Sequence, residues 1–181
     1  MLVRWMRFES SQFMRNLLQL RGILWPIEWD FRSFAGMNWN VLRTVLLDLA
    51  VFVLAVVVGA AVNGAVVTLG AGLVPLPEGL PPGANMNTPE GIRAAVPHLA
   101  PLHFLFPWLA HAIGTLAGAI IAARWTSERM RTIAAYAIGL LFFSGGLWMA
   151  TQIPDPIWFV VLDLSLAYLP MAWLALRLVK R

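Results

Sequence analysis

The chain has 181 residues, of which 60% are apolar and 12% charged, with a formal net charge of +4. Soluble chains have about 45–50% apolar and about 25% charged residues, so this composition excludes an ordinary soluble domain and indicates a membrane protein. Because the chain has no cysteine, disulfides, thiol catalysis and cysteine-ligated metals are also excluded.

The first 40 residues are predicted to form an arginine-rich leader on the cytoplasmic membrane surface. Leu2, Trp5, Phe13 and Leu17 recur at helical spacing, and arginines occupy the other side. This pattern is typical of an interfacial amphipathic helix, with its apolar stripe at headgroup level. An alternative stays open, in which Met37 is the true start and the leader is not translated.

Four apolar segments are predicted to cross the membrane, since a crossing helix needs about 20 apolar residues. They cover about residues 44–66, 101–123, 132–150 and 156–178. The first segment has an overlong apolar run, from Val41 to Leu76. Residues 41–181 are therefore expected to form one all-α domain, that of a polytopic membrane protein with four transmembrane helices.

The segments between and within the spans carry local signals. The connection 75–97 is proline-rich and is predicted to be a loop, with a lid as the alternative. Thr88-Pro89 has the chemistry of a helix start and predicts a short helix over 89–95. Bends are expected at Pro107 and Pro170, and Thr126-Ser127-Glu128-Arg129 is expected to cap the third span.

The basic residues predict the orientation of the chain. Twelve of the thirteen lysines and arginines lie before the first span, in the connection between spans two and three, or in the tail, and Arg93 is the exception. Basic residues in short loops stay on the cytoplasmic side, so both termini are predicted to be cytoplasmic, in the inner membrane of a bacterium. The positive charge is then a retention signal and a contact for anionic lipid, with no nucleic acid as partner.

Small residues on the second span predict close helix packing. Gly114 and Gly118 form a GxxxG pattern, and His111 and Thr115 lie on the same face. Four-residue spacing of small side chains lets two membrane helices approach closely. We therefore expect Gly114 and Gly118 at a packed helix interface.

Polar side chains inside the spans predict a buried cluster. Counting about 1.5 Å per helical residue places polar side chains of three spans at a similar depth in the membrane. The expected members are Asn63, His111, Thr115, Asp163 and Tyr168. Such residues are costly in a membrane and mark functional sites by default. Structural hydrogen bonding, a proton or ion path and a ligand site are the three interpretations left open.

No catalytic motif or metal-site spacing is present in the chain. His98, His103 and His111 do not fit H-E-x-x-H, and no G-x-S-x-G or phosphate-binding loop occurs. We expect no metal and no cofactor, although a helix histidine such as His111 can ligate a tetrapyrrole, which remains an alternative.

Three stretches, Val62–Gly79, Leu102–Ala123 and Pro154–Leu174, carry a resemblance to a known group. The most specific motifs are HAIGTLAGAIIAA and PDPIWFVVLDLSLAYLPMAWL. From about Gly59 onward the chain resembles an uncharacterised group of small bacterial four-span membrane proteins. The resemblance implies a four-span fold and a membrane location, and it implies no reaction. The arginine-rich leader departs from the group's pattern.

These observations predict a non-enzymatic integral inner-membrane protein, an accessory or structural component that associates with itself or with a larger membrane complex. The alternative is a small transport or proton-conducting protein that uses Asp163 and His111. A third interpretation is a membrane-embedded enzyme or tetrapyrrole binder.

Overall fold

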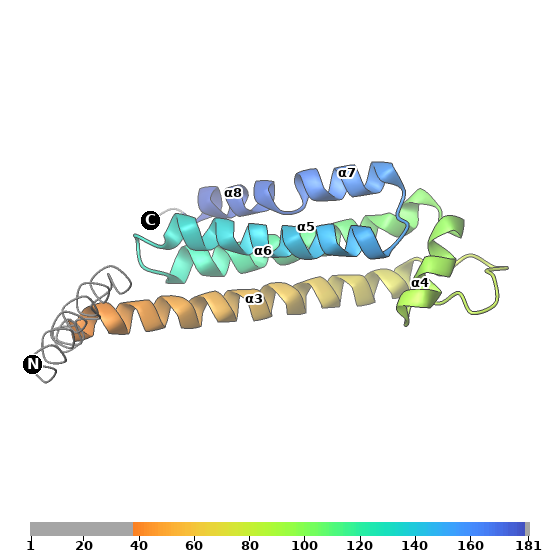
Figure 1. The fold of residues 1–181 in the computed structure, drawn as a ribbon. Helices are drawn as coiled ribbons and strands as arrows, with labels where there is room; N and C mark the ends of the chain where they lie inside the picture. Colours follow the sequence, from red (N-terminus) through yellow and green to blue (C-terminus); the bar gives the residue numbers. More distant parts are fainter. Residues whose placement is uncertain (1–37, 180–181) are drawn as a thin grey trace, which may run out of the picture. The chain divides into compact units, whose positions relative to one another are not determined.

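The computed structural model describes residues 38–179, shown as coloured ribbon in Figure 1. The chain divides into two units, Met1–Val41 and Leu42–Arg181, and the fold below is that of the second. The amphipathic leader predicted for residues 1–40 lies outside the described residues, apart from residues 38–40.

The described residues form helices, of which α3 and α4 are joined by the connection of residues 74–88 and the others by shorter segments. The helices are α3 (Trp39–Leu73), α4 (Pro89–Ala95), α5 (Leu105–Trp125), α6 (Arg131–Gln152), α7 (Ile157–Leu166) and α8 (Leu169–Leu178), with 3-10 turns η1 (Val96–His98) and η2 (Pro101–Phe104). Four helical segments are long and apolar enough to cross a membrane: Trp39–Leu73, Pro101–Trp125, Arg131–Gln152 and Ile157–Leu178. The prediction of an all-α polytopic membrane protein with four transmembrane helices is confirmed.

The first membrane helix, α3, is much longer than the predicted span 44–66. It runs unbroken for 35 residues, and no proline occurs between Trp39 and Leu73. At about 1.5 Å per residue it is about 52 Å long, against a hydrocarbon thickness of about 30 Å. A helix of this length either tilts or extends beyond the hydrocarbon.

Small side chains form the contacts between the membrane helices. Alanines of α5, α6 and α8 make the main core, around Ile138. α3 lies against α5 at a row of glycines, where a Cβ at Gly59 would come within 2.9 Å of the Gly114 carbonyl oxygen. A Cβ at Gly118 would lie 2.8 Å from the carbonyl oxygen of Ala55 on α3. The Gly114/Gly118 face therefore packs inside the bundle.

One end of the bundle, here called the basic end, holds the start of α3, the α5–α6 connection and the end of α8 (Figure 1). The arginines near these helix ends are Arg43, Arg124, Arg129, Arg131 and Arg177. The opposite end, here called the α4 end, has Arg93 as its basic residue among residues 38–179. Arg93 donates from Nε to the Gln152 carbonyl at 2.6 Å, which satisfies a free carbonyl at the end of α6.

Side chains tie the elements together at the basic end. Asp48 of α3 accepts two bonds from Ser127, one from the backbone N–H at 2.7 Å and one from the hydroxyl at 2.6 Å. Arg131, at the start of α6, donates to the carbonyl oxygens of Leu176 and Val179 at the end of α8. These contacts fix α3 to the α5–α6 connection and α6 to α8.

The capping prediction for residues 126–129 is wrong. α6 begins only at Arg131, and its N-cap, Met130, makes no side-chain cap bond. Thr126 instead ends α5, where its hydroxyl donates to the Ala122 carbonyl at 2.7 Å. Ser127 is engaged by Asp48, so a tertiary partner has taken the hydroxyl that local spacing assigned to the cap.

The other local predictions divide between agreement and difference. The short helix Pro89–Ala95 forms as expected, and the Thr88 hydroxyl accepts from the Gly91 N–H at 3.1 Å. Pro107 lies in the first turn of α5, where its missing N–H costs no intrahelical bond, so the expected bend is replaced by the change from η2 to α5 at Leu105. The break expected at Pro170 is present.

Candidate functional site: a polar cluster beside a groove

The fourth membrane segment is interrupted where the polar side chains meet. α7 ends at Leu166 and α8 begins at Leu169, with Pro170 in its first turn. Proline has no N–H to donate to the carbonyl four residues earlier, so the helix cannot continue regularly through this point. The backbone of Tyr168 leaves the helical conformation (φ −122°, ψ −80°), and its side chain is 2% exposed.

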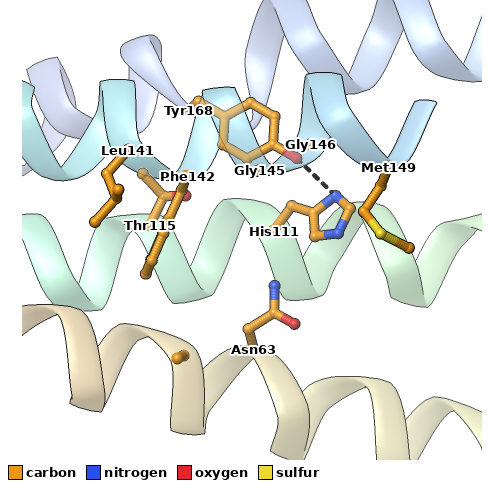
Figure 2. Close-up of a pocket in the computed structure, with 10 residues that line it drawn as sticks. Asn63, His111, Thr115, Leu141, Phe142, Gly145, Gly146, Met149 and Tyr168 are labelled. Carbon is orange, nitrogen blue, oxygen red and sulfur yellow. Dashed lines mark hydrogen bonds between the residues drawn. The ribbon is translucent and has the colours of Figure 1, made fainter. Parts of the chain in front are cut away.

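Three side chains then form what we call the His–Asp–Tyr cluster: His111, Asp163 and Tyr168. The Tyr168 hydroxyl donates to Oδ2 of Asp163 at 2.8 Å. Nδ1 of His111 lies 2.9 Å from Oδ1 of Asp163. It also lies 3.0 Å from the Tyr168 hydroxyl oxygen, a contact that Figure 2 shows as a dashed line. Because a carboxylate only accepts, the hydrogen on the imidazole belongs on Nδ1, and in the neutral ring Nε2 is left as an acceptor.

The surroundings of the cluster are fitted to its members. Asp163 is 5% exposed, and a carboxylate at mid-membrane costs about 2.5–3.5 kcal/mol on insertion scales unless it is paired or hydrated. Both of its oxygens have donors here. Gly146 of α6 leaves room for the Tyr168 hydroxyl, since a Cβ at Gly146 would overlap it. The His111 and Tyr168 rings stack, with 5.7 Å between centroids.

A groove lies beside the cluster, between α3 and α6, and we call it the α3–α6 groove. Its volume is about 270 Å³. It is lined by Ala60 and Asn63 of α3, His111 and Thr115 of α5, Leu141, Phe142, Gly145, Gly146 and Met149 of α6, and Tyr168 (Figure 2). The groove is therefore apolar along α6 and polar along α5 and α3.

The structure brings the five sequence-predicted polar residues to one place, in two different roles. His111, Asp163 and Tyr168 are hydrogen-bonded to one another. Asn63 lies across the groove with its amide directed toward His111 (Figure 2), and Thr115 is fully buried on the groove wall. The hydroxyl of Thr115 finds no hydrogen-bond partner within residues 38–179.

Comparisons with known proteins add nothing to this geometry. Neither a family model, nor a curated protein, nor a solved structure matches the chain. The fold and the site therefore carry the functional argument.

Sequence reasoning missed one titratable group near the cluster, Asp155. It lies half-buried in the turn between α6 and α7, outside the membrane-spanning segments. The pKa of Asp155 is raised to about 6, mainly by burial and also by the negative charge of Asp163, with His111 partly offsetting both. An aspartate enclosed by Pro154 and Pro156 was the available signal, and it indicated only a turn.

Chemically, the cluster can orient an imidazole and hold a proton. Nothing in the described part of the chain assembles three or more histidine, aspartate or glutamate side chains around a possible metal position. Nε2 of His111 could still act as a single axial ligand to a tetrapyrrole metal, but the tetrapyrrole would then have to fit into the groove. Ligand pockets usually measure about 300–1,000 Å³, so a groove of about 270 Å³ favours a small head group over a tetrapyrrole.

Proposed function

We propose that the protein is a non-enzymatic integral protein of the bacterial inner membrane, an accessory or structural component of a membrane complex. Both termini are proposed to face the cytoplasm, where the basic end contacts anionic lipid. The gathering of arginines at that end supports this orientation. The resemblance to small bacterial four-span proteins supports the bacterial assignment.

The observation that carries the proposal is the exposure of α3. Of its 35 residues, Ala55, Gly59 and Gly70 are buried, so one narrow face packs against the bundle. A second row of small residues is exposed at four-residue spacing, comprising Ala60, Gly64, Thr68 and Gly72. A Cβ at Gly64 or Gly72 would meet nothing within 4 Å. Rows of this kind let membrane helices associate, and this one has no partner within the described bundle.

In this proposal the His–Asp–Tyr cluster is a structural lock. Asp163 belongs to α7, Tyr168 immediately precedes α8, and His111 belongs to α5. Their hydrogen bonds hold the interrupted fourth segment against α5 at the point where helical bonds are missing. Hydrogen bonds between membrane helices average about 0.6 kcal/mol, so the lock adds to alanine packing and does not replace it.

The experiment compares two neighbouring substitutions on α3, Gly64→Leu and Ala65→Leu. Both residues are exposed, and Ala65 points away from the small-residue row by about 100° of helical rotation. Protein extracted in mild detergent is analysed by native electrophoresis, with two tagged copies in one cell to separate self-association from a larger complex. The wild type is expected to migrate above its 20.0 kDa mass, Gly64→Leu as a monomer, and Ala65→Leu as the wild type.

Gly118→Leu is not a suitable probe of association. A Cβ at Gly118 would already press on Ala55 and Ile138 within the bundle, so a larger side chain disturbs the fold itself. A wild-type protein that is monomeric both in detergent and after cross-linking in native membranes would overturn the accessory role.

A second candidate function is proton conduction through Asp163 and His111. It is favoured by the position of Asp155 in the turn at the α4 end, where its charge interacts with both of these residues. Proteoliposomes loaded with a pH-sensitive dye test it. A proton flux that Asp163→Asn abolishes favours conduction, and the absence of any flux in the wild type removes this candidate.

A further inference from the structure

The α3–α6 groove contains polar atoms whose hydrogen-bonding capacity is unused. Thr115 is fully buried, yet its hydroxyl has no partner in the described bundle. A threonine or serine inside a helix usually donates to the carbonyl four residues earlier. Thr68 and Ser144 do so in this chain, each at 2.8 Å. The Thr115 hydroxyl, on the wall of the groove, does not make this bond to the carbonyl four residues earlier.

Two further groups face the same space. Asp163 and Tyr168 engage Nδ1 of His111, so Nε2 of the neutral ring remains an acceptor, and no residue between 38 and 179 bonds it. From α3, the Asn63 amide is directed toward His111 across the groove (Figure 2). The groove thus offers one acceptor and two groups that can donate, within a space of about 270 Å³.

The position of these groups makes them accessible from the bilayer. His111 is ten residues from Pro101, and Asn63 is ten residues from the end of α3 at Leu73. At about 1.5 Å per residue both lie about 15 Å from the α4 end of their own helical segments. Leu141, Gly145 and Met149 at the groove are exposed on α6, so the groove opens beside a lipid-facing surface.

We propose that the α3–α6 groove binds the hydroxyl head group of a membrane-soluble molecule with an apolar body. One hydroxyl donates to Nε2 of His111 and accepts from the Thr115 hydroxyl or the Asn63 amide. A ketone or ether oxygen lacks the hydrogen that Nε2 requires, and an ammonium group lacks an acceptor for the donors. Leu141, Phe142 and Met149 supply apolar contact to the body of the molecule.

Two sources share this chemistry: a phenolic ring such as a hydroquinone, and an aliphatic long-chain alcohol. The test uses a hydroquinone with a ten-carbon tail, the same tail on an unsubstituted benzene ring, and 1-decanol. Each is added to the protein in lipid nanodiscs with ¹⁵N-labelled histidine. The chain has three histidines, so the Nε2 resonance of His111 is assigned by its loss in His111→Gln.

The expected result is a saturable shift of the His111 Nε2 resonance with the hydroquinone, and no shift with the tailed benzene. A response to 1-decanol as strong as to the hydroquinone assigns the site to aliphatic alcohols. A response to the hydroquinone alone assigns it to phenols. His98 and His103 lie outside the groove lining, so their resonances serve as internal controls.

Two substitutions separate binding from folding. Gly145 lines the groove, and a Cβ there would meet nothing within 4 Å. Gly145→Leu is therefore expected to fill the groove and abolish the shift while the cluster stays hydrogen-bonded. Thr115→Val keeps the shape of the side chain and is expected to weaken hydroquinone binding by about three- to tenfold, the loss of one hydrogen bond. Ala65→Leu, exposed and outside the groove lining, is expected to bind as the wild type does.

Three outcomes overturn the proposal. They are no saturable response of His111 to either hydroxyl compound, an equal response to the tailed benzene, and unchanged binding in both Gly145→Leu and Thr115→Val. The first outcome leaves water as the occupant of the groove, since a water molecule satisfies the same donors and acceptors. The second means that the apolar body binds without a hydroxyl, and the third places the binding outside the groove.

Discussion

Two adjacent glycines of α6 have opposite surroundings although they share one turn of helix. A Cβ at Gly145 would meet nothing within 4 Å, and a Cβ at Gly146 would overlap the Tyr168 hydroxyl and lie 2.7 Å from its ring carbon Cζ. Tyr168 cannot retreat without leaving Asp163 and His111. Gly146 is therefore required by the cluster, and Gly145 is not.

The first prediction follows from this pair. Gly146→Ala is expected to destabilise the protein by about 1–3 kcal/mol, the usual cost of overpacking a tight contact. Gly145→Ala is expected to stay within about 0.5 kcal/mol of the wild type, as a surface substitution does. Unfolding in detergent, followed by circular dichroism, measures both. Equal stability of the two variants would contradict the fitted contact between Gly146 and Tyr168.

A second prediction concerns Asp155 and pH. Its pKa in the folded protein is raised to about 6 from the ordinary 3.8, so between these values the folded state binds more protons than the unfolded state. Stability contributed by this group is therefore present at low pH and falls as pH rises from about 4 to about 6. Above that range the contribution is constant.

Asp155→Asn is expected to remove this part of the pH dependence and to be more stable than the wild type at pH 7. The measurement is the unfolding temperature in detergent between pH 4 and pH 7. Glu90→Gln, whose side chain is 80% exposed, is the control and should follow the wild type. An unchanged pH profile in Asp155→Asn would show that the pKa of Asp155 is not raised in the folded protein.

At the residue scale, sequence identified the polar residues and not their bonds. Asp163 and His111 stand out because ionisable groups inside apolar spans are costly. Their partners depend on helix rotation, which hydropathy does not report. Thr115 illustrates this limit, because it shares the face of His111 as predicted and yet takes no part in the hydrogen-bonded cluster.

At the scale of elements, the break in the fourth segment was predictable and its consequence was not. Pro170 predicts an interruption because it removes a backbone donor. The inward turn of Tyr168 requires space on α6, and that space comes from Gly146, which is 22 positions earlier in the chain. The fit between Tyr168 and Gly146 can be recognised only when α6 and the fourth membrane segment are placed side by side.

The capping prediction for residues 126–129 was wrong for a related reason, namely a contact between segments far apart in the chain. Local spacing gives a hydroxyl to the nearest helix start, whereas the ionised side chain of Asp48 offers Ser127 a stronger partner from 79 positions away. Asp48 thus ties α3 to the α5–α6 connection.

The third prediction tests this tie. Asp48→Ala removes the acceptor for two bonds from Ser127 and is expected to destabilise the protein by about 1.5–3 kcal/mol, the range for a hydrogen bond to a charged group. Thr68→Ala on the same helix is the control, because Thr68 bonds only the Gly64 carbonyl within α3 and should change stability by less than about 0.5 kcal/mol. Both are measured by detergent unfolding. A loss in Asp48→Ala no larger than in Thr68→Ala would mean that Ser127 and Asp48 contribute nothing to the docking of α3.

At the scale of the whole molecule, the four spans followed from hydropathy because the bilayer permits few alternatives. Lipid cannot satisfy backbone N–H and C=O groups, so each apolar run of sufficient length must be helical. Rows of small residues determine which helices pack together, and this chain has more than one such row. Gly114 and Gly118 face α3 inside the bundle, while Gly64 and Gly72 of α3 remain outside it. Hydropathy treats these rows alike, so their roles had to come from the structure.

The fourth prediction is the orientation of the whole chain. Antiparallel spans in even number bring the start of α3 and the end of α8 to the basic end, with Arg43, Arg124 and Arg131. If these arginines are retained in the cytoplasm, a green fluorescent protein after Arg181 fluoresces. Alkaline phosphatase inserted after Gly83, in the connection at the α4 end, is active because its disulfides form only outside the cytoplasm. Exchanging the two reporters is the control and should silence both. Active phosphatase after Arg181 would reverse the orientation, and with it the proposed contact of the basic end with anionic lipid of the cytoplasmic leaflet.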